Sequence, residues 1–124
     1  MKTRACLFGI LLTTATLRAG AGEPMTVRVS PAVAFAPATL IVRTNIEADA
    51  RNRTVEIVAE SLAFYRSSEA QLDGDRAPRT STFEFRSMPP GTYDVKATLR
   101  DASGQARAQV RSTVNVIAAG GSDR

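Results

Sequence analysis

The sequence contains no histidine and no tryptophan, and its single cysteine, Cys6, lies close to the N-terminus. The lack of histidine excludes Ser-His-Asp and Cys-His nucleophilic sites and, with only one cysteine, most zinc sites. Glu56 and Glu60 share one predicted strand face, but four residues of extended chain separate them by about 13 Å. The carboxyl pair of a glycosidase needs about 5–9.5 Å. We therefore expect no enzyme activity and no cofactor.

Long hydrophobic runs are also missing, apart from a short one near the N-terminus. A basic start at residues 1–4 is followed by an apolar segment at residues 5–12 that ends at Thr13 and Thr14, and then by the stretch LRAGAG at residues 17–22, which supplies small residues. This layout is typical of a secretory signal peptide and is too short for a membrane span of about 20 residues. We predict that residues 1–21 are removed and that the remaining chain is secreted or periplasmic, with no membrane span.

The excess of positive charge belongs mostly to this N-terminal segment. Lys2, Arg4 and Arg18 lie within it, so its removal would lower the formal net charge from +4 to +1. The remaining arginines are spread along the chain without a cluster that could follow a phosphate backbone. Nucleic acid is therefore not an expected partner.

From residue 26 onward the sequence alternates between apolar and polar residues, which is the pattern of half-buried strands. The alternation predicts strands at residues 26–30, 39–47, 53–60, 80–86, 93–100 and 106–116, with a weaker one at 62–65. One helical turn fits residues 67–72, and turn signals occupy 72–75 and 101–104. The side chains expected to point inward on the later strands are Leu40, Val42, Thr44, Ile46, Val55, Ile57, Ala59, Phe83, Phe85, Tyr93, Val95, Ala97, Leu99, Ala106, Ala108, Val110, Val114 and Val116.

These strands predict an all-β protein, because a parallel α/β sheet would show continuously apolar strands. Pro31 and Pro37 bound a segment that we expect to form an edge strand that bends or switches sheets. The prediction is a single antiparallel β-sandwich of about seven strands over residues 25–118, followed by a flexible tail at 119–124.

The stretch MPPGTYDV, residues 88–95, precedes a strong alternating strand. Pro90, Gly91 and Tyr93 in this stretch resemble the tyrosine corner of immunoglobulin-like sandwiches, where the tyrosine hydroxyl bonds back to nearby backbone. Val95 stands where antibody domains have their second cysteine. The resemblance therefore implies a bacterial immunoglobulin-like domain without the antibody disulfide. With the preceding FEFR, the stretch also resembles the prealbumin-like carboxypeptidase regulatory and collagen-adhesin B domains, which are β-sandwiches with structural or adhesive roles.

The segment 61–79 is the candidate interaction surface, because loops on a rigid sandwich often carry binding and because Tyr and Arg are favoured at interfaces. Its candidate residues are Tyr65, Arg66, Asp73, Asp75, Arg76 and Arg79. The alternative is an ordinary polar connection between sheets. Of Phe64 and Tyr65, which are neighbours, one should face outward. The triplet Asn52-Arg53-Thr54 fits a glycosylation site, although a turn position that suits the backbone tolerance of asparagine is the simpler interpretation of Asn52.

We therefore expect a non-catalytic immunoglobulin-like module that binds another protein or mediates adhesion at the cell envelope. The segment 61–79 or an exposed edge strand would make the contact. The alternative is a module that binds polysaccharide or calcium, with Asp73 and Asp75 as the calcium candidates, although the sequence does not continue as an EF-hand loop.

Overall fold

The computed structural model describes residues 23–119, which form strands and one short 3-10 helix. The predicted signal peptide at 1–21 and residues 120–124 of the predicted tail lie outside the described residues. The strands are β1 (Met25–Ser30), β2 (Val33–Phe35), β3 (Ala38–Ile46), β4 (Thr54–Glu60), β5 (Tyr65–Gln71), β6 (Thr80–Met88), β7 (Gly91–Arg100) and β8 (Ala106–Ile117). The 3-10 helix η3 (Gly74–Arg76) lies between β5 and β6.

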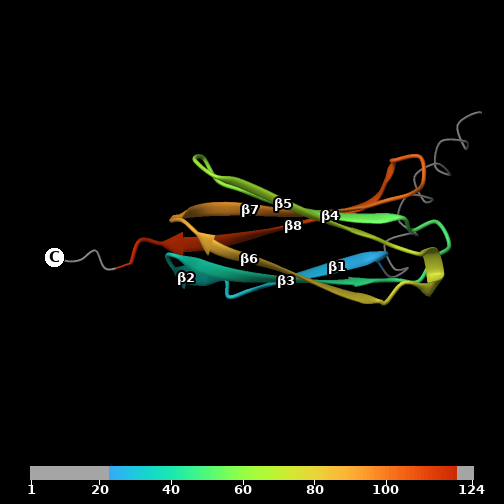
Figure 1. Cartoon of the computed structure of the whole chain (residues 1–124), viewed down its shortest axis with the longest axis horizontal. Coiled ribbons are helices and arrows are strands. Elements are labelled where there is room, and N and C mark those ends of the chain that lie inside the picture. Colours follow the sequence, from blue (N-terminus) through green and yellow to red (C-terminus); the bar gives the residue numbers. More distant parts are fainter. Residues whose placement is uncertain (1–22, 120–124) are drawn as a thin grey trace, which may run out of the picture.

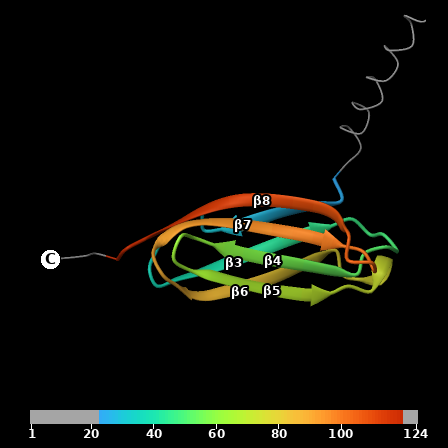
Figure 2. The same cartoon turned by 90° about the horizontal axis from the view of Figure 1, so that it is seen from above.

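The strands form two sheets that face each other (Figures 1 and 2). One sheet has three strands in the order β1-β3-β6, and the other has five in the order β2-β8-β7-β4-β5. The predicted all-β sandwich is confirmed, with eight strands instead of about seven. One strand pair departs from the antiparallel arrangement, since the three-residue strand β2 runs parallel to the end of β8.

The segment with two prolines changes sheets, as its sequence predicts. β1 pairs with β3 in the three-stranded sheet, whereas β2 pairs with β8 in the five-stranded sheet. Pro31 lies between the two strands. Because proline has no N–H to donate to a ladder, it suits a position where the chain leaves one sheet before it joins the next.

The core lies between the two sheets and is built from alternate residues of the central strands. Every inward residue predicted on β3, β4, β6 and β7 is buried, and the four on β7 have no exposed surface. On β8, Val114 and Val116 are buried and Ala108 and Val110 are partly buried. The prediction for Ala106 is wrong, because this side chain is exposed. The pairing of β7 with β8 shifts register between Leu99 and Arg100, and such a shift changes which side chains face inward.

β5 corrects two predictions about residues 62–72. The weak strand expected at 62–65 lies instead at Tyr65–Gln71, and the helical turn expected at 67–72 is wrong, because these residues continue the strand. β5 pairs with β4 along its whole length. It is the last strand of its sheet, and its alternate residues are only partly buried, so it needs few apolar side chains. This polar edge strand has no apolar alternation from which the sequence could predict it.

The MPPGTYDV stretch forms the connection between β6 and β7. The hydroxyl of Tyr93 donates a hydrogen bond to the backbone oxygen of Pro89 over 2.7 Å, and the Tyr93 side chain is fully buried. Gly91 lies against Ser61, where an added Cβ would be only 3.1 Å from the Ser61 Cβ. The glycine therefore allows the β6–β7 connection to pack closely on the chain that leaves β4.

We predict that Tyr93→Phe lowers the free energy of unfolding by about 1 kcal/mol, because the ring still packs while the bond to Pro89 is lost. Chemical denaturation followed by far-ultraviolet circular dichroism measures this. The matched control is Tyr65→Phe, since Tyr65 is 59% exposed and should change stability little. Equal stability of the Tyr93→Phe variant and the wild type would show that the bond does not hold the connection.

Candidate interaction surface at the loop end

Three connections meet at one end of the sandwich, the right-hand end in Figures 1 and 2. They join β3 to β4 (residues 47–53), β5 to β6 (residues 72–79) and β7 to β8 (residues 101–105). We call this set of residues the loop end. Antiparallel pairing of β4 with both β5 and β7 brings the loops together, because it places the start of β4 beside the end of β5 and the end of β7.

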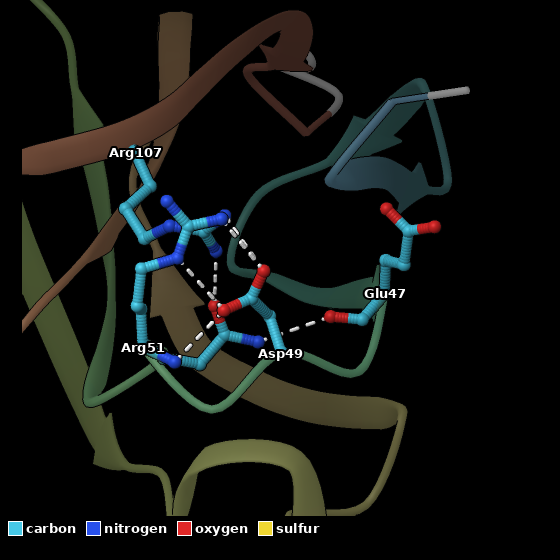
Figure 3. Close-up of polar contacts among 5 residues, drawn as sticks. Glu47, Asp49, Arg51 and Arg107 are labelled. Atoms are coloured by element: carbon cyan, nitrogen blue, oxygen red, sulfur yellow. Dashed lines mark hydrogen bonds and ion pairs between the residues drawn. The ribbon is translucent and has the colours of Figure 1, made fainter. Parts of the chain in front are cut away.

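Asn52 links the β3–β4 and β5–β6 connections to each other and to β8 from inside the loop end, where its side chain is only 1% exposed. Its Nδ2 donates a hydrogen bond to the backbone oxygen of Glu47 over 3.0 Å, and its Oδ1 accepts one from Nη1 of Arg107 on β8. Its backbone oxygen accepts a bond from the N–H of Gly74 at 3.0 Å. The two side-chain partners of Asn52, Glu47 and Arg107, are labelled in Figure 3. One buried side chain thereby ties β8 to the β3–β4 loop.

The interpretation of Asn52 as a residue chosen for backbone tolerance is wrong. Its φ is not positive; within residues 23–119, Ser87 is the only non-glycine residue with a positive φ. The structure also argues against the glycosylation triplet, because the amide nitrogen that would carry a sugar is buried and already donates a hydrogen bond. The side chain of Asn52 can be buried because its Nδ2 donor and its Oδ1 acceptor both have hydrogen-bond partners there.

Asp49 joins the same network at its solvent side. Its carboxylate accepts hydrogen bonds from the backbone nitrogen of Arg51 at 2.8 Å, from Nε and Nη2 of Arg51 at 3.0 and 2.9 Å, and from Nη2 of Arg107 at 3.1 Å (Figure 3). The side-chain bonds from Arg51, followed by the backbone bond from the same residue, hold the pKa of Asp49 well below its ordinary value. The same pairing raises the pKa of Arg51.

Gly74 provides the close contact between the β3–β4 and β5–β6 connections. Its φ is +57°, in the left-handed region that favours glycine. A Cβ at this position would lie 3.0 Å from the backbone oxygen of Ala50. The Asp73-Gly74-Asp75 stretch is therefore a turn packed against the neighbouring loop.

Residues of two connections surround a hollow of about 380 Å³. Its lining residues are Ala50, Arg51, Arg53, Asp101, Ala102 and Ser103. The Asp101 carboxylate organises the β7–β8 turn, accepting bonds from Ser103 Oγ at 2.7 Å, Ser103 N at 2.9 Å and Gln105 N at 3.1 Å. The bond from Ser103 Oγ is the main cause of the lowered pKa of Asp101. The hollow thus presents arginine side chains beside a fixed turn.

The six candidate residues of segment 61–79 do not form one surface. Four of them are exposed at the loop end: Asp73, Asp75, Arg76 and Arg79. Tyr65 and Arg66 instead begin β5 and lie at the opposite end of the sandwich. Tyr65 is 59% exposed, so the prediction that one of two neighbouring aromatic rings faces outward is confirmed.

Arg66 makes contacts within the molecule. Its Nη1 donates a hydrogen bond to the backbone oxygen of Arg86 on β6 over 2.7 Å, and its guanidinium lies 5.2 Å from the centre of the Phe64 ring. β5 and β6 are edge strands of the two different sheets. Arg66 therefore bridges the two sheets along one side of the sandwich, and its guanidinium is already engaged there.

Residues 47–53 and 101–105 were not predicted from the sequence as part of the site. Both stretches are polar connections between predicted strands, and a count of strand reversals would have placed them at the same end as residues 72–79. The burial of Asn52 has no such signal, because asparagine is equally common in exposed turns.

Comparison with known proteins shows similarity at the level of the fold. No protein-family model matches the chain, and no curated protein matches it in sequence. Among solved structures, superoxide reductase (neelaredoxin) from Ignicoccus hospitalis is 13% identical, with a TM-score of 0.56 over 76% of this chain and 80% of that one. A variant of the same reductase gives 11% identity and a TM-score of 0.58 over 82% and 86% of the two chains.

A CARDB domain from Pyrococcus furiosus, solved in complex with di-metal ions, is 16% identical, with a TM-score of 0.46 over 76% of this chain and 93% of that domain. Within residues 23–119 of the present chain, no three side chains of Asp, Glu, His or Cys are grouped so that they could hold a metal ion. No helix in this part of the chain is long and apolar enough to span a membrane.

We predict that Asn52→Ala lowers the free energy of unfolding by about 2–3 kcal/mol, because the change leaves the buried partners of its side chain without hydrogen bonds. Asn45→Ala is the matched control, since Asn45 is exposed and its removal should cost less than about 0.5 kcal/mol. Denaturant titration of both variants measures the difference. Similar stability of the two variants would contradict the structural role of Asn52.

Asp49 should make the stability depend on pH. Its folded-state pKa is depressed, so its contribution is present above the ordinary value of 3.8 and is lost as the pH falls below it. We predict that the melting temperature of the wild type drops more between pH 5 and pH 3 than that of Asp49→Asn, as differential scanning calorimetry would measure. Parallel pH profiles of the two proteins would rule out this pairing in solution.

Proposed function

We propose that this protein is a secreted or periplasmic, non-catalytic immunoglobulin-like module that binds another protein at the cell envelope through its loop end. The observation that carries the proposal is the network around Asn52, which ties the β3–β4 connection to the β5–β6 connection and to β8, while exposed side chains of these connections face solvent. Loops held by a rigid scaffold are a common way to build a binding surface, because less conformational entropy is lost on binding.

The strand order supports the immunoglobulin-like assignment. β1, β3 and β6 correspond in sheet position to strands A, B and E of such domains, and β8, β7 and β4 correspond to G, F and C. β5 then takes the place of the additional strand beside C in variable-type domains. Tyr93 lies near the start of the strand that corresponds to F, and its bond to Pro89 matches the tyrosine corner.

The same correspondence supports the loop end as the binding face. In variable domains, the loops that join B to C and F to G belong to the antigen-binding end. Here the equivalent connections are residues 47–53 and 101–105, and both line the hollow beside Arg51. The side chain of Arg51 is 69% exposed although it pairs with Asp49.

The chemistry of the loop end favours a protein partner with a mixed-charge surface. Asp73, Asp75, Arg76 and Arg79 are exposed in the β5–β6 connection of the loop end. Arginine is enriched at protein interfaces, where its guanidinium can form paired hydrogen bonds with carboxylates.

The alternative contact, strand addition at β5, has less support. Arg66 on this edge points toward the interior and bonds to β6. An inward charge on an edge strand is one of the features that protect sheets from pairing with other chains.

The test is capture of a partner from an envelope extract by the immobilised protein. Arg76→Glu reverses an exposed charge at the loop end, and Ala102→Arg places a large side chain in the hollow. Both should reduce recovery of the same captured protein at least tenfold, as quantified by mass spectrometry. Ser67→Arg is the control, because Ser67 is exposed on β5, away from the loop end, and this variant should retain the partner.

All three variants should unfold like the wild type, since the altered side chains are exposed. Full recovery of the partner with both loop-end variants would contradict the proposed surface. Failure of the wild type to capture any protein would contradict the proposed function.

A further inference from the structure

The outer face of the three-stranded sheet carries two arginines side by side. Arg28 on β1 and Arg43 on β3 are direct partners in the antiparallel register. The Cβ atoms of such partners lie about 4.5–5.5 Å apart, and like charges in this arrangement are destabilising. Both side chains are exposed.

Neither arginine has a carboxylate partner among residues 23–119. The other arginines on outer sheet faces behave differently. Arg86 pairs with Glu84 at 3.1 Å, Arg100 with Glu56 at 3.3 Å and Arg111 with Asp94 at 3.5 Å. The pair at Arg28 and Arg43 therefore leaves two adjacent positive charges without compensation.

The neighbouring side chains add neutral hydrogen-bonding groups. Thr26 lies opposite Asn45, and Asn45 lies opposite Thr80 on β6. These three residues, the two arginines and Val27 line a hollow of about 360 Å³. Thr82 is the partner of Arg43 on its other side. Hydroxyl and amide groups of this kind can donate hydrogen bonds to an anion held by the arginines.

The carboxylates near this face do not pair with Arg28 or Arg43. Glu84 lies opposite Ile41, two residues along β3 from Arg43, and it forms an ion pair with Arg86. Glu23 and Glu47 line a separate hollow with Thr26 and Asn45, at the end of the sheet. Neither of the latter two lines the hollow that contains the arginines.

We propose that this face binds an oxyanion, as a phosphate, sulfate or carboxylate group, between Arg28 and Arg43. Guanidinium groups donate paired hydrogen bonds to such groups, and the bound charge would relieve the repulsion between the two arginines. The outward residues of β1, β3 and β6 include no aromatic ring. A ligand would therefore be recognised through its charge and not by stacking. This site lies on a sheet face and is independent of the proposed function of the loop end.

The experiment compares thermal unfolding in sodium phosphate, sodium sulfate and sodium chloride at matched ionic strength. Phosphate and sulfate should raise the melting temperature of the wild type by about 5 °C more than chloride does, once the anion reaches about ten times its dissociation constant. Arg28→Gln and Arg43→Gln should each lose this extra stabilisation. The control Arg111→Gln should keep it, because this arginine lies on the other sheet.

A second measurement guards against loss of fold in the variants. In low salt without phosphate or sulfate, Arg43→Gln should melt at the same temperature as the wild type or higher, because it removes a repulsion. Equal stabilisation by phosphate and chloride in the wild type, or full retention of the phosphate effect in both arginine variants, would overturn the proposal.

Once phosphate has been shown to raise the melting temperature of the wild type, vesicle sedimentation distinguishes a lipid headgroup from a soluble anion as the ligand. Sedimentation with phosphatidylglycerol vesicles that free phosphate displaces would identify a lipid headgroup. No sedimentation with these vesicles, together with the stabilisation by phosphate, would identify a soluble anion. Vesicle binding that Arg28→Gln and Arg43→Gln leave unchanged would contradict the site.

Discussion

Burial of alternate side chains between two sheets is the constraint on which the rest of this structure depends. Residues 23–119 contain no cysteine, so no disulfide supports the fold in this part of the chain. Tyr93, Val95, Ala97 and Leu99 of β7 are completely buried, and β3 packs its own alternate residues against the same interior. Each large apolar side chain buried in this way contributes about 1.5–3 kcal/mol. The alternation of apolar and polar residues thereby determines which side chains of each strand point inward. Because the chain reverses direction between antiparallel strands, the loops lie at the two ends of the sandwich.

The loop end extends this interior with polar contacts. Asn52 is as buried as the core residues, yet its neighbours are a backbone oxygen and the guanidinium of Arg107. A buried amide is tolerated only where its donors and acceptors are satisfied, so the network specifies one arrangement of the connections. The exposed residues around this network can then differ in charge while the connections keep their arrangement. The outer faces of the two sheets also differ in charge. The five-stranded sheet pairs its charges across strands, whereas the three-stranded sheet places Arg28 beside Arg43.

The amino-acid pattern was sufficient for the fold class and for most of the core, because β3, β4, β6 and β7 alternate strongly. It was insufficient for β5, whose edge position removes the need for apolar residues, and for Ala106, where a register shift turns the side chain outward. The candidate site was predicted in part. Asp73, Asp75, Arg76 and Arg79 lie at the loop end, but Arg66 bridges the two sheets instead. Asn52 and Arg107 are 55 residues apart, and local sequence carries no information on such a contact.

Amide hydrogen exchange followed by nuclear magnetic resonance tests the central claim most directly, because it reports on the interior and the loop end together. The Gly74 N–H donates to the backbone oxygen of Asn52 at 3.0 Å, and the Leu72 N–H donates to that of Arg53 at 2.8 Å. If the loop end is a continuation of the packed interior, these two amides exchange as slowly as those of β7 between Tyr93 and Leu99. Exchange at the rate of an exposed loop, with β7 still protected, would contradict this account.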